Sequence, residues 1–167
     1  MTKPGPQRLS RLLRERGPAL VLYAQQWCRN PEDVVQEAFL QLVEEPAEPA
    51  NVVAWLYRVV RHRALNASRS AARRTRRESA AALPGEAWFE PSQDPLVADE
   101  ASAALRQLPL EQREVIVARL WGGLSFEEVA EVTGLSLSTA YRRYQAGIEA
   151  LRERLGVECP ENETPQT

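Results

Sequence analysis

The sequence predicts an all-α protein with two small helical domains joined by a flexible linker, the second of them a helix-turn-helix domain. Apolar residues recur at helical spacing along most of the 167 residues, and no alternating strand pattern appears. A segment rich in Pro, Gly and acidic residues, 78–95, divides the chain. Beyond it, the stretch LSFEEVAEVTGLSLSTAYRRY (124–144) is typical of two short helices around a tight turn.

The first half predicts basic helical structure over residues 6–16, an interruption at Gly17-Pro18, and a second helix that starts in the turn containing Pro18 and contains Trp27. Asn30 and Pro31 form a good helix start, because Asn can cap and Pro fits the first helical position. The helix that follows has one apolar stripe, made of Val34, Val35, Ala38, Phe39 and Leu42.

The Pro-broken connection EEPAEPAN precedes a third helix, which is expected to begin near Asn51. We therefore expect residues 1–77 to form the first domain and residues 78–95 to form the interdomain linker, with Trp88 and Phe89 as candidates for holding it against a domain.

The second domain is expected over residues 96–156, with a helix over 96–108 and a stop at Gly122-Gly123. Ser125 and Glu128 have the spacing of a capping box, and Gly134 can supply the left-handed residue that ends the helix. Ser136 caps a last helix over 137–155, and residues 157–167 are expected to be disordered.

Charge is divided unequally between the two halves, although the net charge is only −2. Residues 1–77 contain 14 basic and 7 acidic side chains, a net charge of +7, whereas the rest contains 7 and 16, a net charge of −9. A polyanion is therefore expected to bind the first half, although the helix-turn-helix lies in the second.

Several functional classes find no support in the sequence. No run of about 18 apolar residues predicts a membrane span, and the N-terminus lacks the apolar core of a signal peptide, so the expected location is the cytoplasm. Cys28 and Cys159 are far apart, and His62 is the only histidine. We therefore expect no disulfide, metal, cofactor or catalytic site.

The helix-turn-helix stretch predicts DNA reading, with a plain helical hairpin as the alternative. Small Ala130, the turn at Gly134 and an apolar interior would turn the start of the last helix outward, toward a major groove. Arg and Gln can bind base edges there, and hydroxyls can bind phosphates. The candidate residues are Ser138, Thr139, Tyr141, Arg142, Arg143 and Gln145.

The third helix contains eight arginines within residues 58–77 and no acidic residue among them. This concentration of positive charge favours contact with nucleic acid. The alternative is that the arginines simply form a solvated helix face. Trp55 and Tyr57 lie beside the arginines and could stack on unpaired bases. For Trp55 a position in the core is favoured, and for Tyr57 the two readings stay open. Asp33, Gln36 and Glu37 form a polar face that, taken alone, reads as solvated surface.

Taken together, these residues resemble the extracytoplasmic-function sigma factors of bacterial RNA polymerase. NPEDVVQEAFLQL with AWLYRVVRHRAL resembles sigma domain two. LPLEQREVIVARLWGGLSFEEVAEVTGLSLSTAYRRYQAGIEALRERL resembles sigma domain four. Both blocks, in this order and with a linker between them, cover about residues 10–156, which makes the resemblance specific.

The resemblance implies roles for both domains. Domain two would dock on the clamp helices of core RNA polymerase through Asp33, Gln36 and Glu37. It would also melt the minus-ten element of promoter DNA, and domain four would bind the polymerase flap and read the minus-thirty-five element with the candidates named above. An anti-sigma factor is a further partner expected by analogy. The minus-ten candidates are Trp55, Tyr57, Arg58, Arg61, His62, Arg63 and Asn66.

The sequence departs from the family pattern at several positions. His62 stands where the family usually has Asn, and Ala146 and Ile148 stand where arginines are common in the last helix. We therefore expect an unusual promoter sequence or a weak dependence on the minus-thirty-five element. Two alternatives remain: a stand-alone helix-turn-helix regulator, for which no dimer face is evident, and a sigma-like adaptor that binds polymerase without reading promoters.

Overall fold

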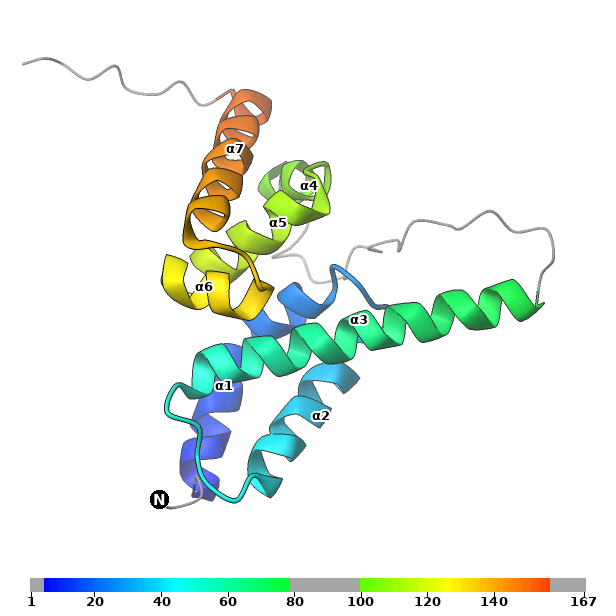
Figure 1. The fold of residues 1–167 in the computed structure, drawn as a ribbon, viewed down its shortest axis with the longest axis vertical. Helices are drawn as coiled ribbons and strands as arrows, with labels where there is room; N and C mark the ends of the chain where they lie inside the picture. The colour runs from blue at the N-terminus through cyan, green and yellow to red at the C-terminus, as the bar shows by residue number, and fades with distance from the viewer. Residues whose placement is uncertain (1–4, 79–99, 157–167) are drawn as a thin grey trace, which may run out of the picture.

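The computed structural model describes residues 5–78 and 100–156, and the side chains of all of these except 100–102. Within these ranges all of the regular secondary structure is helical (Figure 1). The first domain contains α1 (Pro6–Ala24), α2 (Pro31–Glu44) and α3 (Val52–Glu78). The second contains α4 (Glu100–Arg106), α5 (Leu110–Ile116), the π-helical turn η1 (Val117–Trp121), α6 (Phe126–Thr133) and α7 (Leu137–Leu155). The predicted all-α, two-domain fold is confirmed.

The first domain is a three-helix unit in which each helix packs on the other two. Leu20 of α1, Leu42 of α2 and Leu56 of α3 meet in its centre with no exposed surface. The apolar stripe predicted for α2 is buried as expected. Because α2 and the first half of α3 bury only one side, their other sides present polar residues to solvent.

The predicted break at Gly17-Pro18 is wrong, because α1 continues through both residues. Proline inside a helix removes one backbone hydrogen bond and crowds the preceding turn, a cost of about 3 kcal/mol. Continuing the helix places Leu20, Tyr23 and Ala24 in the core, where all three are fully buried. Tertiary packing therefore overrides a local signal that is correct in isolation.

The helix starts in the first domain differ in how they are capped. Pro31 occupies the first turn of α2 as predicted, but the Asn30 side chain makes no capping hydrogen bond. At α3 the Asn51 side chain does cap, since its Oδ1 accepts from the backbone N of Ala54 at 3.0 Å.

The second domain follows the predicted local signals closely. Ser125 and Glu128 form the capping box of α6, and Gly134 ends that helix in the left-handed region with φ +72°. The Ser136 hydroxyl accepts from the backbone N of Thr139 at the start of α7. The corner between α6 and α7 is therefore the predicted helix-turn-helix.

The two domains pack against each other, which the sequence did not predict. Helix α6 packs on the first half of α3 (Figure 1). The turn η1 packs on α1. Buried residues of both domains form one continuous apolar cluster. The linker, apart from Glu78 at the end of α3, and the tail predicted over 157–167 lie outside the described residues.

Candidate polymerase and nucleic-acid interfaces

The outer face of α2 presents the polar residues predicted to bind polymerase. Asp33, Gln36 and Glu37 are all exposed. Glu37 is already paired, because its Oε2 accepts from Arg63 Nη1 at 2.8 Å. Arg63 also donates to Gln41 Oε1 at 2.9 Å. The structure therefore joins a predicted polymerase contact to a predicted DNA contact through one ion pair.

Two apolar residues of α2 were missed by the sequence reasoning. Leu40 is 57% exposed and Val43 is 41% exposed. At about 100° per residue, Leu40 lies on the same side of the helix as Asp33 and Gln36. The place of Leu40 could have been recognised from the sequence. Leu40 follows Asp33 by seven residues and Gln36 by four, and residues at these spacings share one face of a helix. This face therefore combines an acid, an amide and an exposed leucine.

The outer face of α3 presents four of the predicted minus-ten residues in one line. Trp55, Arg58, His62 and Asn66 follow one another at spacings of three or four residues, which places them on one side of a helix. Arg58, His62 and Asn66 are exposed, and Trp55 is half-buried against the core. The Asn66 amide lies 3.4 Å from a ring nitrogen of His62.

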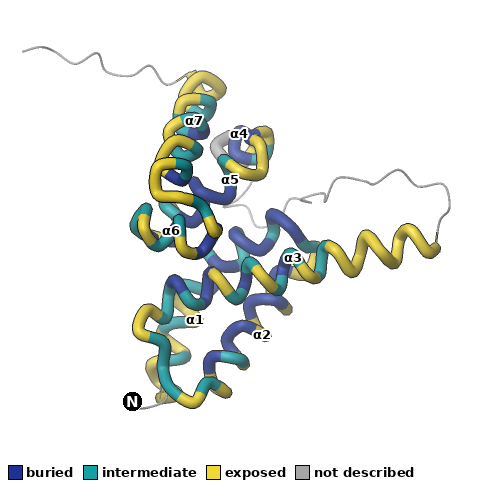
Figure 2. The backbone as a smooth tube through the Cα atoms, viewed as in Figure 1, coloured by how far each residue is buried: buried dark blue, intermediate teal, exposed yellow. Residues whose placement is uncertain are grey.

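The same line continues into the part of α3 that projects beyond α1 and α2 (Figure 1). We call this segment, residues 69–77, the arginine arm. All its residues are exposed (Figure 2). No salt bridge within the described ranges involves its arginines. A shallow hollow on the arm is lined by Ser70, Arg73, Arg74, Arg77 and Glu78.

Two predicted minus-ten residues do not lie on this outer face. Tyr57 is fully buried, and burial raises the pKa of its phenol. Arg61 points into the contact between the domains, where its Nε lies 2.5 Å from Glu114 Oε1. In this arrangement Tyr57 has no surface for a base, so the open choice between stacking and core is resolved in favour of core. The reason is angular, since residues 57 and 61 lie on other sides of α3 than Arg58 and His62.

Helix α7 presents its first turns to solvent, as predicted for a recognition helix. Ser138, Tyr141, Arg142 and Gln145 are exposed, and Thr139 is half-buried. Gln145 Nε2 donates to the Tyr141 hydroxyl at 2.7 Å, and the Tyr141 ring packs on Phe126.

Arg143 is turned away from these residues, toward α5. Its Nη2 lies 3.3 Å from Glu111 Oε2, and Arg143 is half-buried. It follows Arg142 by one position and therefore by about 100° around the helix. Its assignment to the DNA-reading face does not fit this geometry.

The parts of the chain that the structure describes contain no group of three or more His, Cys, Asp and Glu side chains that could hold a metal ion. None of the described helices is long and apolar enough to cross a bilayer.

Comparison with known proteins identifies the family. The family model "Sigma-70 region 2" matches residues 12–74, and "Sigma-70, region 4" matches residues 98–151. RNA polymerase sigma factor CarQ of Myxococcus xanthus is 34% identical over 134 residues, which cover 75% of this chain and 74% of CarQ. This chain belongs to the extracytoplasmic-function sigma factors of bacterial RNA polymerase. Its function is therefore to direct promoter recognition by that polymerase.

Other relatives of this sigma factor agree with the assignment. EcfG of Rhodopseudomonas palustris is 31% identical, with 80% of this chain and 76% of EcfG covered. SigE of Mycolicibacterium smegmatis is 29% identical, and the match covers 79% of this chain but 54% of SigE. Sigma factors are in general non-enzymatic initiation factors.

Two solved structures share the fold. Bartonella quintana RpoE, in complex with the anti-sigma factor NepR, has a TM-score of 0.69 and 25% identity, and the match covers 90% of this chain and 97% of RpoE. CnrH, in complex with the cytosolic domain of CnrY, has a TM-score of 0.58, and the match covers 93% and 92% of the two chains. The CnrH match, at 22% identity, concerns the fold alone.

Proposed function

We propose that the two domains of this sigma factor divide promoter opening between them. Residues 1–77 dock on the clamp helices of core polymerase and hold the minus-ten element, and residues 96–156 bind the flap and read the minus-thirty-five element. Residues 78–95 connect them. The observation that carries the proposal is that α2 and α3 present an acidic face and a basic face from one packed three-helix unit. No catalytic step is assigned to this chain.

The docking face of α2 is proposed to consist of Asp33, Gln36 and Leu40. The carboxylate and amide supply directed hydrogen bonds, and the exposed leucine, one turn further along the same face, supplies apolar area. Glu37 also contributes to docking, either while its ion pair with Arg63 is in place or after that ion pair breaks. Leu40 is thus a docking residue that the polar motif alone does not reveal.

The line from Trp55 to Asn66 on α3 is proposed to hold the non-duplex minus-ten bases. Turning a base out of the stack costs a few kcal/mol. Stacking on an aromatic ring returns about 1–3 kcal/mol per base, and the guanidinium of Arg58 can neutralise the adjacent phosphate. His62 can hydrogen-bond a base edge with its ring nitrogens.

The arginine arm is proposed to bind the phosphates of duplex DNA next to the melted element. From Trp55 to Arg77 the helix rises ~33 Å, close to one turn of duplex DNA. Arg69, Arg73 and Arg76 continue the line of Arg58 and His62 at helical spacing. One helix face therefore follows the DNA from unpaired bases into duplex.

The salt dependence of DNA binding by the holoenzyme tests the arm. We expect the double variant Arg73→Gln/Arg76→Gln to reduce the slope of log K against log salt by up to about 1.8, because each phosphate contact contributes about 0.9. Arg11→Gln/Arg14→Gln, which removes two exposed arginines of α1, serves as the control and should leave the slope unchanged. Equal slopes for both variants would contradict a role for the arm.

Reading of the minus-thirty-five element is proposed to be weak. Arg142 is the exposed arginine in the first turns of α7, whereas Arg143 is paired with Glu111. Ala146 and Ile148 are half-buried, and Ile148 packs against the core. Strong footprint protection at an ordinary family-type minus-thirty-five element would rule this out.

A gel shift with and without core polymerase separates this function from the alternatives. The proposal expects a sequence-selective complex only when core polymerase is present. A selective complex of the protein alone would favour a stand-alone regulator. A polymerase complex without promoter selection would favour an adaptor.

The proposed partners and cellular location follow from this function. Core polymerase and promoter DNA are the partners, so the cytoplasm is the proposed location. An anti-sigma factor is a further proposed partner, because the RpoE structure contains one, NepR. No cofactor is assigned.

A further inference from the structure

We infer that Tyr141 and Gln145 of α7 act as one reading unit, which selects an adenine in the minus-thirty-five element, and that Phe126 of α6 holds this unit in place. This role rests on the proposed reading of that element by domain four, and it names the base that is selected. Base contacts determine which sequence is bound, whereas phosphate contacts supply much of the affinity. A reading unit is therefore compatible with weak overall dependence on the element.

The two side chains of the reading unit are joined by a direct hydrogen bond. Gln145 Nε2 donates to the Tyr141 hydroxyl at 2.7 Å, and both residues are exposed. Their spacing of four residues places them one turn apart on the same side of α7. Because the hydroxyl oxygen accepts this bond, its own proton stays available to the DNA. The flexible glutamine side chain is thus held in one position before DNA binds.

The Tyr141 ring is supported by Phe126, the first residue of α6. The Phe126 ring meets the rings of Tyr141 and Tyr144 edge to face, with centroids 5.2 Å apart in each pair. The guanidinium of Arg119 lies over the Phe126 ring, 5.1 Å from its centroid, and Arg119 Nη1 donates to the Leu124 carbonyl at 2.9 Å. Such ring contacts have preferred geometries, so Tyr141 is held both through its ring and through its hydroxyl.

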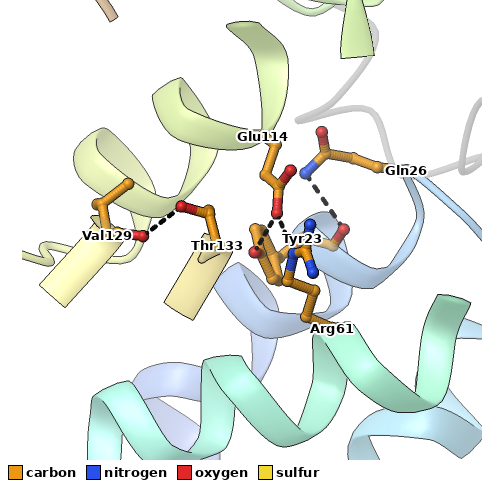
Figure 3. A network of polar contacts seen from close by, with 6 residues as sticks. All are labelled: Tyr23, Gln26, Arg61, Glu114, Val129 and Thr133. Carbon is orange, nitrogen blue, oxygen red and sulfur yellow. Dashed lines mark hydrogen bonds and ion pairs between the residues drawn. The ribbon is translucent and has the colours of Figure 1, made fainter. Parts of the chain in front are cut away.

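Helix α6 is itself fixed near both ends, which makes Phe126 a firm support. At the start of the helix, the Ser125 hydroxyl accepts from the backbone N of Glu128 at 3.1 Å. Near its end, the hydroxyl of buried Thr133 donates to the Val129 carbonyl at 2.7 Å (Figure 3). The reading unit on the second helix of the helix-turn-helix is therefore supported by the first.

The other exposed polar candidates at the start of α7 are suited to different contacts. Ser138 Oγ lies 3.2 Å from the Oγ of the cap residue Ser136, which also donates to Thr139 Oγ1 at 2.8 Å. Hydroxyls held at a helix start suit phosphate oxygens. The charge of exposed Arg142 suits a phosphate or a guanine. Gln145 is the candidate with the donor and acceptor that adenine requires.

The groups that remain available on Gln145 match the major-groove edge of adenine. With one amide hydrogen given to Tyr141, Gln145 retains its second Nε2 hydrogen and its Oε1 acceptor. Adenine presents an acceptor at N7 and a donor at N6, which fit this pair. Guanine presents two acceptors there, so the Gln145 carbonyl oxygen would face O6 without a donor. The Tyr141 hydroxyl can donate to a neighbouring phosphate and so set the position of Gln145 over the base.

A promoter library randomised across the minus-thirty-five element measures the selected base. Holoenzyme assembled from core polymerase and this sigma factor is mixed with the library, and the fragments bound in a gel shift are sequenced. We expect the wild type to favour adenine at one position by about tenfold or more, as a bidentate contact allows. Gln145→Glu should move the preference there to cytosine, because a carboxylate accepts from cytosine N4 but cannot donate to adenine N7.

The matched control for this change lies on the first domain. Gln7→Glu makes the same exchange of amide for carboxylate at an exposed residue of α1, and it should leave every base preference unchanged. A change of the preferred base at a single position is not produced by loss of stability, which weakens binding to all sequences alike.

Two variants test the support of Gln145 separately from its contact with the base. Tyr141→Phe removes the hydroxyl and keeps the ring, whereas Phe126→Leu keeps an apolar side chain and removes the ring contacts. Each should lower the adenine preference at the same position by about threefold, because a released glutamine must be ordered when it binds adenine. Preferences at the other positions should persist.

The outcomes separate the reading unit from the proposed function. A wild-type holoenzyme that selects no base in the element would overturn both the reading unit and reading by domain four. Selection that Gln145→Glu leaves unchanged would overturn the reading unit and keep the proposed function. A preference that moves with Gln145→Glu but is unaffected by Tyr141→Phe and Phe126→Leu would overturn the supporting roles of these two residues.

Discussion

Replacing Asp33 and Gln36 by alanine is expected to reduce the affinity of this sigma factor for core polymerase by at least about 100-fold. Residues that dominate an interface each cost about 2 kcal/mol or more on truncation, and 1.4 kcal/mol corresponds to a factor of ten. Both side chains are exposed on α2 and form no salt bridge in the described ranges. Their removal should therefore leave the fold intact. Titration of labelled protein with core polymerase measures the loss.

The control for this prediction is a matched acid and amide elsewhere on the same domain. Gln7→Ala/Glu15→Ala removes an exposed amide and an exposed carboxylate from α1, with the same change in charge. If both double variants lose affinity equally, then general electrostatics rather than the face of α2 governs docking. Leu40→Ala, on the same face, should weaken binding without any change in charge.

Replacing Leu56 by alanine is expected to lower the free energy of unfolding by about 2–5 kcal/mol, because a buried leucine leaves a cavity when truncated. Leu56 is fully buried in α3, in the helix that packs on both α1 and α2. The loss is a large part of the stability of a small domain. Urea denaturation followed by circular dichroism measures it.

The stability prediction has its own internal control in α2. Leu40→Ala, at 57% exposed, should change the free energy of unfolding by less than about 0.5 kcal/mol. Coincident denaturation midpoints for the two leucine variants would show that Leu56 is not part of a cooperative core. Leu56→Ala thus tests the contribution of a buried side chain to stability, whereas Leu40→Ala tests a docking residue whose loss leaves stability nearly unchanged.

Local signals predicted the second domain better than the first. Ser125, Gly134 and Ser136 act within one helix turn of their position, so sequence alone determines what they do, and α7 has the predicted bounds. Pro18 is equally local, but the residues that keep α1 continuous lie in the core and depend on the other helices. Asn30 is a second example in which the local signal did not predict the structure, because its side chain makes no capping hydrogen bond.

The candidate sites were predicted in part. The line of Trp55, Arg58, His62 and Asn66 follows from helical spacing alone. The same spacing places Tyr57 and Arg61 on other sides of α3. The partner of Arg61 could not be predicted, because Glu114 is 53 residues away in sequence. Nothing local indicates such a contact. The roles of the faces came from family resemblance rather than from geometry.

Run-off transcription with purified core polymerase tests the proposed division of promoter opening most directly. Core polymerase is incubated with this sigma factor and a library of promoter fragments, and unpaired thymines are mapped by permanganate. The prediction is a defined start site with an open bubble, lost with Asp33→Ala/Gln36→Ala and reduced with Arg58→Gln/His62→Ala. Promoter-specific transcripts that persist at full level in both variants would contradict the proposed docking and minus-ten faces.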